Sequence, residues 1–213
     1  MGSNEPDSPP QYSPKALEIM ARTNELLAIG GYAGFSYADI AELVNVKKAS
    51  IHHHFPTKAD LVKATVARHR QATRRGLASL DQLAADPLER LVAYARFWAE
   101  CIGESNPPIC ICALLAAEMP ALPGEVADEV KGHFNDLQAW IALNMEQGAA
   151  LGTVRLTDTP SAEASTFMAS IHGAMLAARV GGDAALFWEI AKVGTDRLRV
   201  ASLHAPDDES VPA

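Results

Sequence analysis

Apolar residues recur along this chain at intervals of three and four positions, the spacing that places them on one face of an α-helix. Alternating runs of β-branched residues and Asn-Gly hairpin turns, which predict strands, are nearly absent. Capping and breaking residues divide the pattern into segments of helical length, with Ser13 and Pro14 opening the first segment and Gly30-Gly31 closing it. The pattern therefore predicts an all-α protein.

Two of the predicted helices are short and lie on either side of a sharp turn. Ser36 and Asp39 have the spacing of a capping box and open a helix of about two turns. Asn45 follows, and after glycine asparagine best tolerates the left-handed backbone that such a turn requires. A second short helix is predicted over residues 47–54. This arrangement is typical of a helix-turn-helix, whose second helix enters the major groove of DNA.

Longer helices are predicted beyond this unit. Thr57 and Asp60 form a second capping box, which starts a helix through the basic stretch 63–75. We expect a helix-turn-helix domain at 13–56, a larger helical domain at 57–204, and disordered tails at 1–12 and 205–213. The later helices are expected from Pro87 towards Cys101, from the Asn106-Pro-Pro108 break to Pro120, from Pro123 to about Gly148, from Pro160 to Val180, and onward to about Leu203.

Charge is distributed unevenly along the chain. The 213 residues carry a net charge of -8, yet residues 15–75 hold ten Lys or Arg against five Asp or Glu. A basic first third on an acidic remainder is typical of a DNA-binding domain joined to a second module. No apolar run reaches the ~18 residues of a membrane span, and no secretory signal is visible. The three cysteines have no disulfide spacing, so we expect a cytoplasmic protein without membrane contact.

A recognition helix must keep an apolar face inward while its polar side chains reach DNA. Lysine and serine can contact guanine or phosphate. Lys58 lies at the start of a helix, where its charge and the free backbone N–H groups together favour a phosphate. The residues expected to face inward are Val46, Ala49, Ile51 and Phe55. The residues then left for DNA are Lys47, Lys48, Ser50, His52 and His53.

Three motifs combine a glycine turn, a helix-turn-helix and a closing His-Phe-x-x-Lys with leucine three positions later. They are Gly31-Tyr-Ala-Gly-Phe-Ser36, Ile40-Ala-Glu-Leu-Val-Asn-Val-Lys-Lys-Ala-Ser-Ile51, and His53-His-Phe-Pro-Thr-Lys58 followed by Leu61. In these motifs the chain resembles the TetR family of bacterial regulators over residues 15–70. The resemblance implies about nine helices, three of them in the DNA-binding head, and a homodimer formed by the last two.

The resemblance also implies functional residues. It places Lys47, Lys48, Ser50, His52 and His53 on DNA, and Ser36, Tyr37 and Lys58 on phosphate. Two positions depart from the family pattern: Asn45 stands where glycine is usual, and His52 where tyrosine is usual, which would make that contact sensitive to pH. The implied function is a repressor that a small-molecule effector releases from its double-stranded operator.

Other interpretations follow from single features of the sequence. His52-His-His54 cannot converge on one metal ion, because successive helical residues lie about 100° apart. An enzyme is not expected, since no nucleophile, general base and orienting acid occur at a spacing typical of a catalytic site. An architectural DNA-binding protein without an effector remains an alternative, which a solid C-terminal core would favour.

The pair Cys110 and Cys112 leaves two interpretations open, ordinary core packing and a sensor of oxidants or electrophiles. Residues two apart on a helix point about 200° apart, so we expect no bond between the two sulfurs. Three cysteines without a nearby histidine cluster make a poor zinc site. The sequence therefore predicts no metal site and no cofactor.

The middle helices are expected to surround the effector. Their aromatic and sulfur-containing residues favour an apolar or aromatic ligand, with His133, Asn144 and His172 as polar groups. The candidate ligand residues are Trp98, Cys101, Met119, Phe134, Trp140, Met168, His172 and Met175, with Phe97 beside them.

The last two helices carry small residues that allow close helix packing, which fits either a dimer interface or packing within one chain. The dimer is favoured because a two-fold operator matches a two-fold protein. The residues concerned are Ala169, Gly173, Ala174 and Ala177, followed by Ala184, Leu186, Phe187, Ile190 and Val193.

Overall fold

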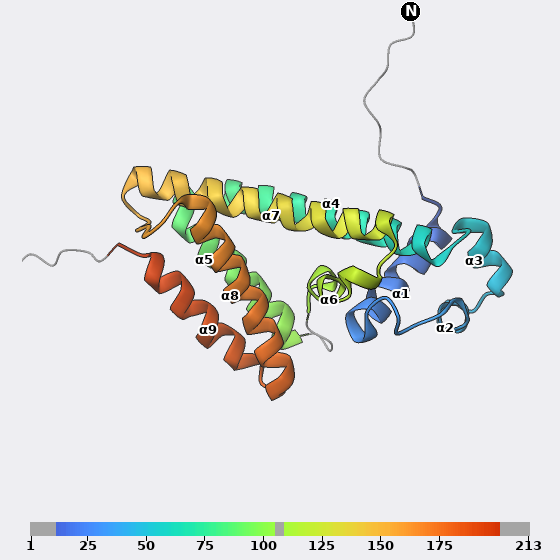
Figure 1. Cartoon of the computed structure of the whole chain (residues 1–213). Coiled ribbons are helices and arrows are strands. Elements are labelled where there is room, and N and C mark those ends of the chain that lie inside the picture. Colours follow the sequence, from blue (N-terminus) through green and yellow to red (C-terminus); the bar gives the residue numbers. More distant parts are fainter. Residues whose placement is uncertain (1–11, 105–108, 201–213) are drawn as a thin grey trace, which may run out of the picture.

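The computed structural model describes residues 12–104 and 109–200, and over these ranges it contains nine α-helices and a 3₁₀ turn at Met119–Ala121 (Figure 1). The all-α prediction is confirmed. The Asn106-Pro-Pro108 break and, apart from Tyr12, the predicted tails lie outside the described residues. The helices are α1 (Pro14–Gly30), α2 (Tyr37–Leu43), α3 (Lys48–His54), α4 (Lys58–Leu83), α5 (Pro87–Glu104), α6 (Ile111–Ala117), α7 (Gly124–Leu151), α8 (Pro160–Gly181) and α9 (Ala184–Leu198).

Helices α1, α2 and α3 form a small head at one end of the molecule (Figure 1). Ile19, Ile40 and Ile51, one from each helix, are fully buried and supply its core. Ser36 and Asp39 make the predicted capping box. Asn45 has a φ of 50° and is the one non-glycine residue with positive φ in the described chain, so the predicted left-handed turn between α2 and α3 is confirmed.

The body is built around α4 and α7, two long helices that run side by side away from the head (Figure 1). Helix α5 packs against α4, α7 and α9, while α8 lies between α7 and α9. Helix α6 sits between the body and the head and contacts both α7 and α1. Since α4 also packs on α1, one continuous helix joins the middle of the body to the head.

Part of the basic stretch 63–75 holds α4 against α7. Asp136 of α7 accepts hydrogen bonds from Arg70 and Arg74 of α4, including contacts of 3.1 Å and 2.8 Å, and Arg70 also reaches Glu129 at 3.3 Å. Hydrogen bonds from Arg70, and then Arg74, hold the pKa of the Asp136 carboxyl well below its usual range. These two arginines therefore stabilise the body by holding α4 against α7.

The C-terminal helices differ from the predicted ones in two respects. Helix α9 ends at Leu198, earlier than the predicted Leu203. Ala174 and Phe187 are buried inside one chain, so they cannot form a dimer surface as expected. Among the described residues, none of the helices combines the length and hydropathy needed to cross a bilayer.

Candidate nucleic-acid interface and small-molecule pocket

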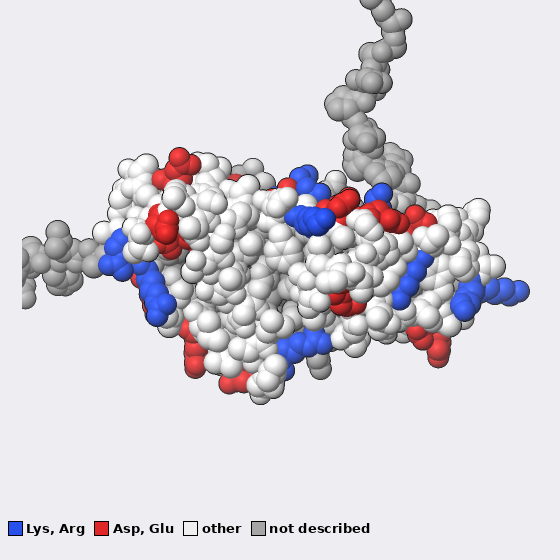
Figure 2. Space-filling view, viewed as in Figure 1, with Lys and Arg blue, Asp and Glu red and all other residues white. Residues whose placement is uncertain are grey.

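The outer surface of α3 carries cations. Lys47, which precedes the helix, and Lys48 and His53 within it are all exposed. Basic side chains project from this end of the molecule (Figure 2). Ile51 is completely buried and Phe55 nearly so, so α3 is anchored by one apolar face while the opposite face is open to a partner, as predicted.

Two residues of α3 lie differently from the sequence-based expectation. Ala49 was expected to face inward but is exposed, and Ser50 was expected to face DNA but is half-buried. The reason is that α3 begins only at Lys48, so its short apolar face is supplied by Ile51 together with Val46 and Phe55 outside the helix. Ala49 therefore joins the outward surface, where its methyl group could contact a thymine methyl.

Tyr37 is buried and serves the fold of the head. Its hydroxyl lies 2.8 Å from the carbonyl oxygen of Phe55 and 2.5 Å from that of Thr57, and burial raises the pKa of Tyr37 to about 12. Its only donor is directed to the backbone between α3 and α4, so in this conformation the hydroxyl is occupied, and the phosphate contact stays a prediction.

His52 packs against Tyr37, with ring centroids 4.6 Å apart. Its Nδ1 lies 3.1 Å from the carbonyl oxygen of Pro56. Because a carbonyl can only accept, Nδ1 carries the proton, and in the neutral ring Nε2 is then an acceptor. A bond from Nε2 to phosphate would require the doubly protonated imidazolium.

Lys58 and Ser36 both have partners within the head. The Lys58 ammonium donates to the carbonyl oxygen of Phe35 and lies 4.1 Å from the Phe35 ring centroid and 4.9 Å from that of Tyr32. Burial lowers its pKa. The Lys58 side chain thus holds the turn between α1 and α2, and its contact with phosphate stays a prediction. Ser36 is exposed and its oxygen caps α2 by accepting from Ala38 at 3.2 Å, while its hydroxyl donates to the Asp39 carboxylate and lowers the pKa of Asp39.

A cavity of about 280 Å³ lies between α4, α5 and α7. This volume suits a small ligand, since pockets for drug-sized molecules range over roughly 300–1,000 Å³. Within the described chain, the Nε1 of Trp98 is buried and makes no hydrogen bond of normal geometry, and it interacts with the hydroxyl of Tyr94. The lining residues are His69, Ala72, Thr73, Gly76, Leu77 and Leu80 of α4, Tyr94, Phe97 and Trp98 of α5, and His133 of α7.

Two family models match the chain. That of the bacterial regulatory proteins of the tetR family matches residues 19–65, and that of the tetracyclin repressor-like C-terminal domain matches residues 87–192. The chain belongs to the TetR family. It is thus a helix-turn-helix transcriptional regulator that binds DNA, and the matches point to such a regulator rather than to an enzyme.

Known TetR-family proteins are similar over most of their length. A regulator from Agrobacterium tumefaciens has a crystal structure with a TM-score of 0.86 and 46% identity, covering 87% of this chain and 98% of that one. The transcriptional regulator AcuR of Cereibacter sphaeroides is 28% identical over 161 residues, 73% of this chain and 72% of AcuR. A TetR regulator from Rhodobacter sphaeroides has the same fold, with a TM-score of 0.80 at 24% identity and coverage of 87% and 100%.

The cavity of this TetR-family chain differs in composition from the predicted ligand site. Of the eight candidate residues only Trp98 lines it. The indole of Trp140 donates to Asp81 at 2.9 Å, and Met175 is fully buried. Six of the ten lining residues belong to α4, and three of these, Ala72, Thr73 and Gly76, are small. The candidates that do not line the cavity are Cys101, Met119, Phe134, Trp140, Met168, His172 and Met175.

Two side chains of the body bind the end of α1 and the turn that follows it. The carboxylate of Glu118, directly after α6, accepts hydrogen bonds from the backbone N–H groups of Tyr32 at 3.0 Å and Ala33 at 3.3 Å. Arg179 of α8 donates to the carbonyl oxygens of Ala28 and Ile29 at 3.0 Å and 2.9 Å. No sequence signal identified these contacts, because the partners lie far apart in the chain.

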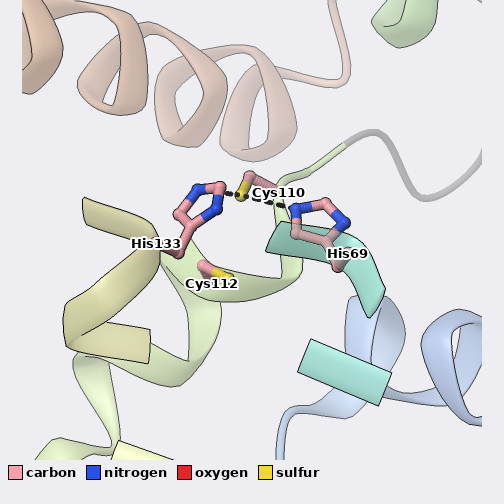
Figure 3. Close-up of side chains that lie close together, drawn as sticks. All are labelled: His69, Cys110, Cys112 and His133. Atoms are coloured by element: carbon pink, nitrogen blue, oxygen red, sulfur yellow. Dashed lines mark hydrogen bonds between the residues drawn. The ribbon is translucent and has the colours of Figure 1, made fainter. Parts of the chain in front are cut away.

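The two cysteines at the start of α6 meet histidines from two other helices (Figure 3). Sγ of Cys110 lies 3.6 Å from Nε2 of His69 and 3.7 Å from Nε2 of His133. The ligand atoms of His69, Cys110, Cys112 and His133 all lie within 4.8 Å of one another. The expectation of cysteines without a nearby histidine cluster is wrong.

The side chains of Cys110 and Cys112 were expected to point away from each other, and this expectation is also wrong. Cys110 has extended backbone angles, φ -61° and ψ 123°, and precedes α6, so the helical spacing argument does not apply to it. Hydrogen bonding from Cys112 and then from the surrounding imidazoles lowers the pKa of the Cys110 thiol well below its usual range. Hydrogen bonding with Cys110 and burial raise the pKa of Cys112.

Proposed function

We propose that this TetR-family regulator is a dimeric repressor that binds its operator through α3 and is released by a small apolar effector. On the DNA side, Lys47, Lys48 and His53 form the exposed surface of the recognition helix. Lysine can donate to guanine acceptors or to phosphate. Ala49, His52 and Ser36 add contacts at the edges of this surface, Ser36 by exchanging its bond to Asp39 for one to phosphate.

The observation that carries effector release is the position of the cavity on α4. Ala72, Thr73 and Gly76 of α4 line the cavity, while the first residue of the same helix, Lys58, holds the head. A ligand that displaces α4 at the cavity would therefore move the head. Such a ligand changes DNA affinity only if it binds the two positions of α4 with different affinity.

The composition of the cavity wall supports an assignment of the effector class. Leu77, Leu80, Phe97 and the ring of Trp98 supply apolar surface. The Nε1 donor of Trp98 has no partner of normal geometry among the described residues. We infer that the effector is a small, mostly apolar or aromatic molecule with one hydrogen-bond acceptor, such as a carbonyl oxygen.

The dimer is proposed to form through α8 and α9. Ala169, Gly173, Leu176 and Val180 lie on one face of α8 and are all exposed, with Val180 89% exposed. Few charged side chains cover α8 and α9 on the face shown in Figure 2. Val193 of α9 is 51% exposed and extends this apolar surface. Two copies joined here would present two recognition helices to an operator with half-sites roughly 34 Å apart.

Gly76 offers a direct test of the cavity. A Cβ at this position meets no atom within 4 Å, so Gly76→Leu should fold and fill the cavity, whereas Gly76→Ala gains the same helix propensity without filling it.

Acetophenone, an aromatic ketone, is the probe, and ethylbenzene is the control ligand because it lacks the carbonyl acceptor. Acetophenone should raise the Tm of the wild type and Gly76→Ala, more than ethylbenzene does, and should not raise that of Gly76→Leu. It should also release operator DNA selected from random duplexes. An equal Tm rise in both Gly76 variants would contradict the assignment.

A further inference from the structure

Four potential metal ligands from three helices converge beside the cavity. His69 comes from α4, Cys110 and Cys112 from the start of α6, and His133 from α7 (Figure 3). Both cysteines are buried and His133 is only 3% exposed. The two imidazole rings flank Cys110 from opposite sides (Figure 3). Such a combination of thiols and imidazoles is uncommon in an apolar interior and calls for a physical reason.

The separations match those around a tetrahedral ion. With Zn–S near 2.3 Å and Zn–N near 2.05 Å, sulfur and nitrogen ligands of one tetrahedron lie about 3.5–3.6 Å apart. The observed distances from Sγ of Cys110 to Nε2 of His69 and of His133 are 3.6 Å and 3.7 Å. All four ligand atoms lie within 4.8 Å of one another, so the most distant pair would have to approach by about 1 Å to reach tetrahedral geometry.

Hydrogen bonding alone leaves the cluster incompletely satisfied. A thiol has one proton, so Cys110 can donate to His69 or to His133 but not to both. Nδ1 of His133 is buried and has no hydrogen-bond partner among the described residues. Buried polar groups without partners are unfavourable. A cation at the centre would bind the four inward-facing atoms at once, whereas Nδ1 of His133, on the other side of the ring from Nε2, would still need a partner.

We propose that His69, Cys110, Cys112 and His133 form a tetrahedral binding site for Zn²⁺. Two thiolates and two imidazoles are a ligand set of structural zinc sites, and sulfur disfavours Mg²⁺ and Ca²⁺. On binding, two S–H bonds break, two Zn–S and two Zn–N bonds form, and two protons pass to solvent. The proposal does not depend on the proposed effector function, although His69 and His133 also line the effector cavity.

The cavity gives the ion a route to the site. His69 and His133 line the cavity as well as the cluster, so an ion in the cavity meets imidazole ligands first. Once bound, it would connect α4, α6 and α7. Since Glu118 follows α6 directly and binds the turn of the head, the ion would also fix the element through which the body holds that turn.

Cobalt provides the test. The full-length protein, stripped of metal and kept reduced with a phosphine, is titrated with Co²⁺ while its visible spectrum is recorded. We expect one Co²⁺ per chain, with the intense d–d bands of tetrahedral cobalt and a near-ultraviolet thiolate charge-transfer band. An equivalent of Zn²⁺ should abolish both. Imidazoles of the exposed His52-His-His54 run cannot produce the thiolate band, so adventitious binding there is distinguishable.

Variants assign the ligands. Cys110→Ser and Cys112→Ser should each weaken Zn²⁺ binding, measured by competition with a chromophoric chelator. The loss should exceed the roughly 10- to 100-fold effect of removing a group that merely supports a metal ligand. Cys101→Ser, outside the cluster, should bind like the wild type. His69→Gln changes a half-buried side chain, so we expect it to retain the fold, checked by circular dichroism, and to lose affinity as well. Absence of tetrahedral bands in the wild type, or full retention of Zn²⁺ affinity by both cysteine variants, would overturn the proposal.

Discussion

Glu118 occupies the space that a side chain on Gly31 would need. A Cβ built on Gly31 would lie 1.7 Å from Oε1 of Glu118, and Gly31 has a φ of 68°. The close approach lets the Glu118 carboxylate reach the N–H groups of Tyr32 and Ala33. Glycine is therefore required here by its backbone conformation and by the contact between the body and the head.

Substitution of Gly31 should be more costly than substitution at a comparable glycine. Gly152 also has positive φ, 74°, but a Cβ there meets no atom within 4 Å. We expect Gly152→Ala to lower the free energy of unfolding by about 1 kcal/mol and Gly31→Ala to lower it by about 1–3 kcal/mol or more. Urea unfolding at one protein concentration measures both, and equal effects would contradict the close contact with Glu118.

Removal of the Glu118 carboxylate should expose two backbone amides. In Glu118→Ala the N–H groups of Tyr32 and Ala33 lose their acceptor, so their hydrogen exchange should become faster. Arg179→Ala is the control, because Arg179 binds carbonyl oxygens of the same region and donates nothing to those amides. Hydrogen exchange read by NMR makes the comparison, and unchanged protection of Tyr32 in Glu118→Ala would argue against the contact.

The Tyr37 hydroxyl should contribute to the stability of the head rather than directly to DNA binding. Tyr37→Phe leaves the carbonyl groups of Phe55 and Thr57 without this donor, and we expect a loss of about 0.5–1.5 kcal/mol in the free energy of unfolding. Tyr32→Phe removes a hydroxyl from a half-buried ring of the same head and serves as the control. A large loss of operator affinity in Tyr37→Phe without any loss of stability would restore the phosphate contact.

The bonds between Asp136 and the two arginines of α4 should make stability depend on pH. We expect Asp136→Asn to lower the free energy of unfolding by about 1.5–3 kcal/mol at pH 7. The folded pKa of Asp136 is lowered, so its contribution is present above the unfolded value near 3.9 and declines as pH falls towards the folded pKa. The difference between variant and wild type should therefore shrink below about pH 4.

Asp128→Asn is the matched control for that measurement. Asp128 pairs with Lys131 on the surface of α7, where the two side chains are 77% and 60% exposed. Such exposed pairs contribute about 0–1 kcal/mol. An equal effect of the two substitutions at pH 7 would show that the Asp136 contacts add nothing to the packing of α4 on α7.

The head could be predicted from sequence because its signals are local. The capping box of Ser36 and Asp39, the turn at Asn45 and the buried Ile51 each depend on residues a few positions apart. The directions in which individual side chains of the head point were harder to predict. Tyr37 and Lys58 have polar groups that DNA could use, but each finds backbone carbonyls in its own head first.

The cavity and the metal ligands depend on tertiary packing. His69 lies 41 residues from Cys110, and His133 lies 23 residues from it, so no short motif joins them. The helical spacing argument at Cys110 and Cys112 failed because one residue precedes the helix that contains the other. Similarly, the small residues of α4 become a cavity wall only when α5 and α7 pack against that helix.

DNA binding by Lys47 and Lys48 is the most direct test of the account. The affinity for the selected operator is measured by fluorescence anisotropy at several salt concentrations. The proteins compared are the wild type, the double variant that carries both Lys47→Ala and Lys48→Ala, and Lys131→Ala, an exposed control. We expect each recognition-helix lysine that reads a base to contribute about 1–3 kcal/mol and each phosphate contact to reduce the salt slope by about 1. The control should bind like the wild type. Wild-type affinity and salt dependence in the double variant would contradict the assignment of α3 as the DNA-reading surface.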